Sequence, residues 1–231
     1  GYSFASWNYD FTVPVTENRI VVASWTANTY KITYNTNGGD IASKTADVVY
    51  DSNFTLATST KRGYDFEGWY YGETLVTDGV WNYDADITLD ARWNTTEYSL
   101  SYNLNDGVLS GNNPLKYTVE SDNITLVNPI KEGYTFAGWT GTDLTTPTLT
   151  VVIASNSIGN REYTANWTLD GYSITYNLDG GVNSKKNPSK YDVTSANIYL
   201  ENATRRGYAF EGWYTNADCT AESKITTITS G

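Results

Sequence analysis

The sequence contains no histidine, no methionine and a single cysteine, Cys219. Without histidine there is no imidazole general base, no Ser-His-Asp or Cys-His catalytic pair and no histidine metal ligand. Zinc fingers and ribbons need four Cys or His ligands, and one cysteine cannot form a disulfide within the chain. The sequence therefore predicts no enzymatic activity, no metal site and no cofactor.

Charged residues are also scarce, and acidic ones dominate. They make up 18% of the 231 residues, with a formal net charge of −11. Nucleic-acid-binding proteins concentrate Lys and Arg, so this balance predicts no nucleic-acid partner. No apolar run approaches the roughly 18 residues of a transmembrane helix, so no membrane insertion of this segment is expected. Aromatic residues, at 15%, are too abundant for a disordered acidic tail.

An internal repeat is the strongest pattern in the sequence. Each copy opens with Tyr-x-x-x-Tyr-Asn, continues with a Gly-rich turn and Gly-Tyr-x-Phe-x-x-Trp, and closes on Ala-x-Trp. These motifs keep one order and nearly constant spacing, which predicts tandem modules. The openings begin at Tyr30, Tyr98 and Tyr172, the central motifs at Gly1, Gly63, Gly133 and Gly207, and the closing motifs end at Trp25, Trp93 and Trp167.

The motifs divide the chain into four parts. Residues 1–25 are the C-terminal half of a repeat (the half-repeat), residues 30–93 (repeat 1) and 98–167 (repeat 2) are complete, and residues 172–231 (repeat 3) lack a closing strand. A half-repeat cannot bury its own apolar face, so we expect the array to continue at both ends or neighbouring molecules to complete it. The linkers are four residues long, which predicts a semi-rigid, elongated array in which each module contacts mainly the next.

The local pattern within each repeat is β. Residues 172–177 alternate large apolar with small polar side chains, which is typical of a strand with one buried face. Pairs such as Gly38-Gly39 allow the tight turns of hairpins. Helix is expected only as short turns at 113–116, 187–190 and 80–84. The predicted class is mainly β (α+β at most), in tandem small, mainly antiparallel modules.

The block Tyr-x-Ile-Thr-Tyr-x-Leu-Asp-Gly-Gly at 172–181, with Asn187-Pro and then Gly-Tyr-x-Phe-x-Gly-Trp-Tyr at 207–214, resembles the Listeria–Bacteroides repeat. This is the B-repeat of internalin-type bacterial surface proteins, and the resemblance covers essentially the whole chain. It implies a β-grasp-like module with no enzymatic activity. It also implies an extracellular protein, secreted or wall-anchored, in which such modules serve as stalks, spacers or adhesive modules.

Two functions stay open at this stage. The first is a non-catalytic extracellular stalk or surface-filament subunit, whose partners are neighbouring repeats or copies of itself. The second is an adhesin whose modules bind host glycan or protein directly. Exposed aromatic residues outside the repeated pattern would carry such contacts, and the candidates are Trp81, Tyr71 and Tyr83.

The repeated tryptophans and acidic turns have plainer explanations than ligand binding. Trp69, Trp139 and Trp213 recur beside Gly and Tyr, which favours core packing over a carbohydrate platform. Each Gly-rich turn offers one Asp, whereas calcium requires six to eight oxygen ligands, so hairpin formation explains these turns better. Cys219 is the best candidate for a link between chains.

The two ends of the chain suggest strand exchange. Residues 20–25 form a closing segment of the type that repeat 3 lacks. Such a segment in one copy could complete repeat 3 of another, producing a polymer. In this hypothesis Ile20, Val21 and Val22 of one copy pair beside Ile225 and Ile228 of the next.

Overall fold

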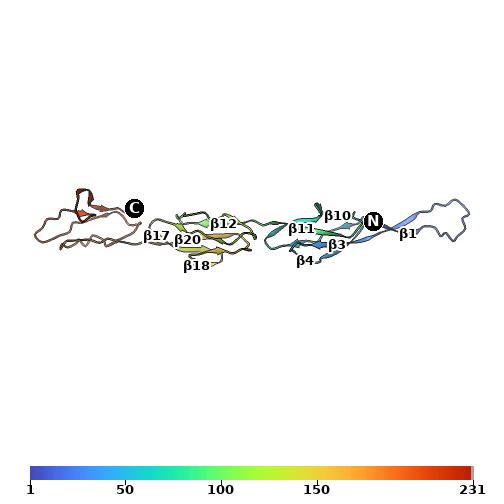
Figure 1. The fold of residues 1–231 in the computed structure, drawn as a ribbon, viewed down its shortest axis with the longest axis horizontal. Coiled ribbons are helices and arrows are strands. Elements are labelled where there is room, and N and C mark those ends of the chain that lie inside the picture. Colours follow the sequence, from blue (N-terminus) through green and yellow to red (C-terminus); the bar gives the residue numbers. More distant parts are fainter. Residues whose placement is uncertain (230–231) are drawn as a thin grey trace. The chain divides into compact units, whose positions relative to one another are not determined.

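The computed structural model describes residues 1–229, and they form strands joined by turns (Figure 1). These residues contain no α-helix, so the mainly β prediction is confirmed, while the likeness to a β-grasp module stays a prediction. The chain divides into two compact units. One unit comprises Gly1–Tyr98, Tyr117–Asp122 and Ser155–Ile158, and the other comprises Ser99–Lys116, Asn123–Ala154 and Gly159–Gly231.

The half-repeat is an antiparallel pair of strands. Strand β1 (Tyr2–Trp7) pairs with β2 (Ala23–Ala27), and Phe4 lies opposite Trp25. The long connection between the strands contains no further strand. The pair therefore presents its aromatic side chains without a second layer to cover them.

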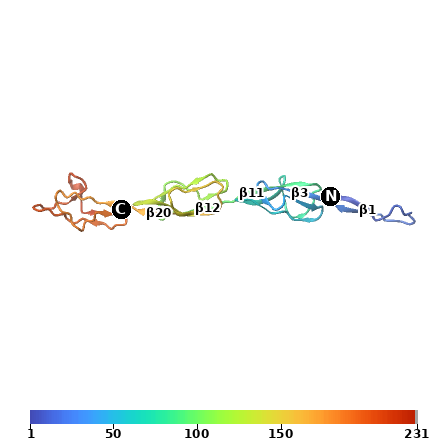
Figure 2. The same cartoon turned by 90° about the horizontal axis from the view of Figure 1, so that it is seen from below.

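Repeat 1 is built around a five-stranded sheet in the order β5-β3-β11-β8-β9. Figures 1 and 2 label β3 and β11 of this sheet. The closing strand β11 lies at its centre, parallel to β3 and antiparallel to β8. The other pairs of this sheet are antiparallel, so the sheet is mainly antiparallel, as the sequence predicts, with one parallel pair at its centre. The strands of repeat 1 are β3 (Thr29–Asn35), β4 (Asp40–Ile41), β5 (Thr45–Val49), β6 (Asn53–Phe54), β7 (Ser59–Thr60), β8 (Tyr64–Tyr71), β9 (Thr74–Val76), β10 (Gly79–Val80) and β11 (Ile87–Thr95).

Repeat 2 reproduces this arrangement. Its sheet has the order β14-β12-β20-β17-β18, with the closing strand β20 parallel to β12 and antiparallel to β17. The strands are β12 (Tyr98–Asn103), β13 (Val108–Leu109), β14 (Lys116–Tyr117), β15 (Ile124–Thr125), β16 (Pro129–Ile130), β17 (Tyr134–Gly141), β18 (Leu144–Thr148), β19 (Val152–Ile153) and β20 (Arg161–Leu169).

The closing strands carry much of each core. In β11, Leu89 and Ala91 are buried, and they pack in one cluster with Ile32 and Trp69. In β20, Tyr163 and Ala165 are buried in the same way, beside a fully buried Trp139. Alternate residues of one strand thus fill the layer between its two neighbours, as the period of a strand requires.

Repeat 3 contains only short two-stranded pairs among its described residues, 172–229. No strand among these residues takes the place that β11 and β20 hold in the other repeats. The elements are β21 (Tyr172–Ser173), β22 (Lys190–Tyr191), β23 (Ile198–Tyr199), β24 (Trp213–Tyr214), the 3-10 turn η1 (Ala221–Ser223), β25 (Lys224–Ile225) and β26 (Thr227–Ile228).

The three short helical turns expected from the sequence are not helical, so this prediction is wrong. The Asn-Pro motif has another use. The side chain of Asn113 accepts a hydrogen bond from the Val127 amide at 2.7 Å and donates one to the Val127 carbonyl at 3.0 Å. Asn187 makes the same two bonds with Glu201. The asparagine therefore ties two segments of the repeat together instead of capping a helix.

Candidate functional site

The most regular polar feature of the chain is a junction that recurs where one repeat follows another. In each junction a linker amide donates to the carbonyl of the glycine that opens the Gly-Tyr motif. The pairs are Asn28 to Gly1 at 2.8 Å, Thr96 to Gly63 at 3.0 Å and Asp170 to Gly133 at 2.9 Å. The linkers are thus held by backbone hydrogen bonds.

The same glycines lie against a side chain of the repeat that follows. A Cβ atom at Gly63 would lie 2.7 Å from the Cβ of Val119, and one at Gly133 would collide with Val193. Gly63 has a φ of 80° and Gly133 a φ of 71°, which L side chains rarely adopt. Glycine is therefore required here twice, for the backbone conformation and for the close approach of the next repeat.

Tyrosine–carboxylate hydrogen bonds accompany two of these junctions. Tyr2 donates to Asp51 at 2.8 Å, and Tyr64 donates to Glu120 at 2.7 Å. The hydrogen bond to the carboxylate raises the pKa of each phenol, because the bond stabilises the protonated form. Arg62 adds a bond of 2.9 Å to the carbonyl of Asn156.

Trp81 is fully buried, so the expectation that it is an exposed ligand contact is wrong. Its ring lies 5.1 Å from that of Phe54 and 5.0 Å from that of Tyr83, within the core cluster of repeat 1. Its indole Nε1 finds no hydrogen-bond partner among the described residues. Trp81 has no counterpart in the other repeats, and it is a core residue specific to repeat 1.

Tyr71 and Tyr83 are brought together by the fold. Their ring centroids lie 5.5 Å apart in an edge-to-face arrangement. Tyr71 is 46% exposed at the end of β8, and Tyr83 is half-buried. They form the exposed edge of an aromatic cluster whose base is Trp81.

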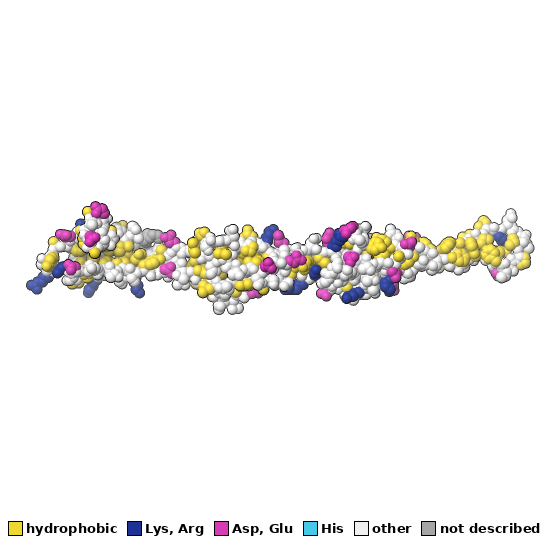
Figure 3. All heavy atoms as spheres, in the orientation of Figure 1, with side chains coloured by type: hydrophobic (Ala, Val, Ile, Leu, Met, Phe, Trp, Pro, Cys, Tyr) yellow, Lys and Arg dark blue, Asp and Glu magenta, His cyan; other side chains and the backbone are white. Residues whose placement is uncertain are grey.

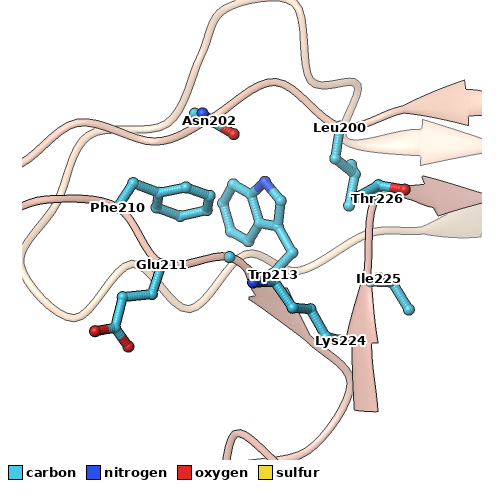
Figure 4. Close-up of a pocket in the computed structure, with 9 residues that line it drawn as sticks. Leu200, Asn202, Phe210, Glu211, Trp213, Lys224, Ile225 and Thr226 are labelled. Carbon is cyan, nitrogen blue, oxygen red and sulfur yellow. The ribbon is translucent and has the colours of Figure 1, made fainter. Parts of the chain in front are cut away.

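The described residues of repeat 3 line a groove. The groove has a volume of about 970 Å³, with Ile174, Tyr176 and Trp213 among its lining residues. Trp213 is half-buried, whereas its counterparts Trp69 and Trp139 are fully buried. Figure 4 shows a smaller pocket that shares Phe210 and Trp213 with this groove, and the centroids of these two rings lie 5.2 Å apart in an edge-to-face arrangement.

Ile225 pairs with Trp213, and Ile228 pairs with Ile198, so each has one partner inside repeat 3. Pairing of these residues with a strand of another copy stays a prediction. Residues 174–177, which correspond to the strand residues 32–35 and 100–103, belong to no strand.

Ile20, Val21 and Val22 lie in the connection before β2. They are 85%, 40% and 53% exposed. The side chain of Asn8 donates to the Ile20 carbonyl at 3.4 Å and accepts from the Val22 amide at 2.8 Å. Hydrogen bonds thus hold Ile20 and Val22 in place, and the side chains of all three residues leave apolar surface uncovered.

The described residues do not gather metal-ligating side chains. Residues 1–229 contain no group of three Cys, Asp or Glu side chains that could hold a metal ion. Cys219 is exposed and unpaired. No helix in this part of the chain is long and apolar enough to cross a membrane.

Comparison with known proteins agrees with the repeat pattern. The Listeria-Bacteroides repeat domain model matches residues 30–93, 98–167 and 172–231. A "Putative membrane protein" of Evansella cellulosilytica is 30% identical over 94% of this chain, and a "Putative Gly-rich membrane protein" of the same organism is 28% identical over 90%. Internalin H of Listeria monocytogenes is 33% identical over 43% of the chain.

The chain spans 35% and 24% of the lengths of the two Evansella relatives and 19% of Internalin H. No solved structure matches it significantly. The three matches to the family model account for most of the chain. The matched ranges include the Gly-Tyr motifs at Gly63 and Gly133 and the closing strands of repeats 1 and 2. The chain belongs to the Listeria-Bacteroides repeat domain family.

Proposed function

We propose that this chain is a non-catalytic extracellular spacer, part of a stalk or surface filament that holds other domains away from a bacterial cell. The observation that carries the proposal is the recurring junction, in which a linker amide bonds to a glycine carbonyl and the glycine lies against the next repeat. Such junctions restrict bending between repeats, which is what a spacer requires. The names of the relatives, two membrane proteins and an internalin, support a surface location, secreted or wall-anchored.

Cys219 allows the restriction of motion to be measured. It is exposed and is the only thiol of the chain, so one fluorophore can be attached without a substitution. Time-resolved anisotropy should show slow rotation of repeat 3, because its linker is bound to repeat 2 through Asp170 and Gly133. Inserting Gly-Ser-Gly-Ser after Asp170 should add a fast rotational component.

The same insertion at Gly72 is the matched control. Gly72 lies in an exposed turn of repeat 1, and no atom lies within 4 Å of a Cβ placed there, so the insertion should leave the rotation of repeat 3 unchanged. Fast rotation of repeat 3 in the unmodified chain would contradict the proposed spacer function.

A second function is supported by the pair formed by Tyr71 and Tyr83. An exposed aromatic edge on a rigid base is typical of surfaces that bind glycan or protein. If repeat 1 is adhesive, Tyr71→Ala should weaken binding to a host glycan or protein array roughly tenfold. Tyr199→Ala, at a 75% exposed tyrosine of repeat 3, is the control that should leave binding unchanged.

A further inference from the structure

The first and the last strand of each complete repeat are neighbours in its sheet. In repeat 1, β3 and β11 run parallel, with residues 32–35 opposite residues 87–90. In repeat 2, β12 and β20 run parallel, with residues 100–103 opposite residues 161–164. The chain enters each repeat through the first of these strands and leaves it through the second. Because the two strands are parallel, the entry and the exit lie at opposite ends of the pair.

This arrangement decides how a repeat responds to tension on its linkers. A pull on both linkers moves the two strands in opposite directions along their common axis. The hydrogen bonds between the strands lie across that axis, so the pull acts on the bonds of all four residue pairs together. A pull on two points at the same end of the pair would instead open these bonds one after another.

A side-chain hydrogen bond extends the pairing at the start of the two strands. The backbone amide of Lys31 donates to Asp86 Oδ1 at 2.8 Å. In repeat 2, the backbone amide of Ser99 donates to Asn160 Oδ1 at 3.0 Å. Both acceptors directly precede the closing strand, so two different residue types make the same contact in the two repeats.

The Ala-x-Trp motif makes two further bonds, to the turn that follows the first strand. Its alanine carbonyl accepts from an asparagine side chain of the turn, and its indole donates to a carbonyl of the turn. The motif therefore ties the outgoing end of the closing strand to the first strand. The bonds are Asn37 to Ala91 and Asn105 to Ala165, both at 2.8 Å, Trp93 to Thr36 at 2.9 Å and Trp167 to Leu104 at 3.0 Å.

Apolar packing keeps water away from much of each pair. In repeat 1, Ile32 and Leu89 are fully buried and Tyr34 is buried. In repeat 2, Leu100 and Tyr163 are buried. A stretched hydrogen bond in such surroundings is not readily replaced by a bond to water, so breaking it costs more than it would at an exposed edge.

The side-chain bonds across the pair of repeat 2 come from uncharged groups. They join a backbone amide, two asparagine side chains, an indole and backbone carbonyls. Uncharged side chains also cover most of the face of repeat 2 that Figure 3 shows. Because salt screens interactions between charges, the strength of this pair should not depend on ionic strength.

We propose that each complete repeat bears tension, and that its parallel strand pair with the flanking side-chain bonds is the clamp that resists the pull. This function goes beyond the spacer role, because a spacer needs length and limited bending, whereas a clamp needs strength along the chain. The clamp lies within one repeat, so it does not depend on docking between repeats. Tandem repeats with the same clamp carry the same tension in series, so the chain keeps its length when it is pulled.

Optical tweezers on the full chain test the clamp by changing only the direction of the pull. Cysteines for the handles replace exposed residues of repeat 1, in a Cys219→Ser background. Thr29→Cys with Asn94→Cys pulls from opposite ends of the pair, as the linkers do. Thr29→Cys with Ala85→Cys pulls from one end. The first combination should need at least about twofold more force, because four residue pairs then resist together instead of in turn.

A matched pair of asparagines in repeat 2 tests the side-chain bonds, with handles at the exposed Ser99→Cys and Thr168→Cys. Asn105→Gly removes a bond across the clamp, and glycine readily adopts the φ of 48° found there. It should raise the rate of unfolding at constant force roughly fivefold, the effect of one hydrogen bond. Asn113→Gly removes two bonds to Val127 that do not cross the clamp. It should lower the free energy of unfolding in urea and leave the rate under force unchanged.

Circular dichroism of each variant checks that its strand content is kept. Equal rupture forces in the two pulling directions would overturn the proposal, because the order of the strands would then not determine the strength. The proposal would also be wrong if Asn113→Gly speeds unfolding under force as much as Asn105→Gly does.

Discussion

Replacing Gly63 by alanine should separate the two requirements for glycine at a junction. At a φ of 80° a residue with a Cβ costs roughly 1–2 kcal/mol. The new Cβ would also lie 2.7 Å from the Cβ of Val119, well inside the ~3.5–4.0 Å of an ordinary carbon contact. Overpacking of this kind costs about 1–3 kcal/mol. The expected loss in the free energy of unfolding is therefore about 2–5 kcal/mol.

Gly207→Ala is the matched control for this change. Gly207 stands in the same Gly-Tyr-x-Phe motif with a φ of 83°, and no atom lies within 4 Å of its Cβ position. Gly207→Ala should therefore lower the free energy of unfolding only by the cost of the left-handed backbone conformation, roughly 1–2 kcal/mol. Urea denaturation followed by circular dichroism measures both losses.

The Val119→Ala background provides a second check. It removes two of the three close contacts that a Cβ at Gly63 would make, so Gly63→Ala should cost less there than in the wild type. If Gly63→Ala and Gly207→Ala lose the same free energy of unfolding, and Val119→Ala does not reduce the loss at Gly63, then Val119 of the next repeat does not crowd this glycine.

Three further predictions follow from the cores and the junctions. Trp69→Ala should cost about 3–5 kcal/mol in urea denaturation because Trp69 is fully buried, and Trp213→Ala should cost clearly less because Trp213 is half-buried; equal costs would contradict the open groove of repeat 3. Because the hydrogen bond to Glu120 raises the pKa of Tyr64 above its unfolded value of about 10, the contribution of this bond should be complete below pH ~10 and lost above it. Tyr64→Phe should remove this alkaline loss, as measured by thermal unfolding across pH. Burial and the nearby Tyr163 raise the pKa of Tyr102 to about 12, so ultraviolet titration should show one phenol of repeat 2 ionising later than the exposed tyrosines.

Much of the fold could be predicted from the sequence because the repeated motifs mark backbone requirements. The Gly-Tyr motif specifies a left-handed turn at Gly63 and Gly133, and the Ala-x-Trp motif specifies the closing strand. The mainly β class followed from alternating side chains. These features depend on local chemistry, which a single sequence shows directly.

The remaining features depend on contacts between distant segments. The parallel pairing of β3 with β11 joins residues far apart in the chain, so a local sequence pattern does not predict it. The burial of Trp81 depends on its packing against Phe54 and Tyr83. Because the other repeats have no tryptophan at this position, comparing the repeats does not predict that Trp81 is buried. The sequence predicts a helical turn at 113–116, because the hydrogen bonds between Asn113 and Val127 join two segments that a local pattern does not connect.

Amide hydrogen exchange at the linkers shows whether neighbouring repeats are docked on one another. If the repeats are docked through their junctions, the amides of Thr96 and Asp170 should exchange slowly, because they donate to the carbonyls of Gly63 and Gly133. Their protection should approach that of strand amides in β11. Exchange as fast as that of the exposed turn at Gly72 would show that the linkers are free and that the repeats are not docked through their junctions.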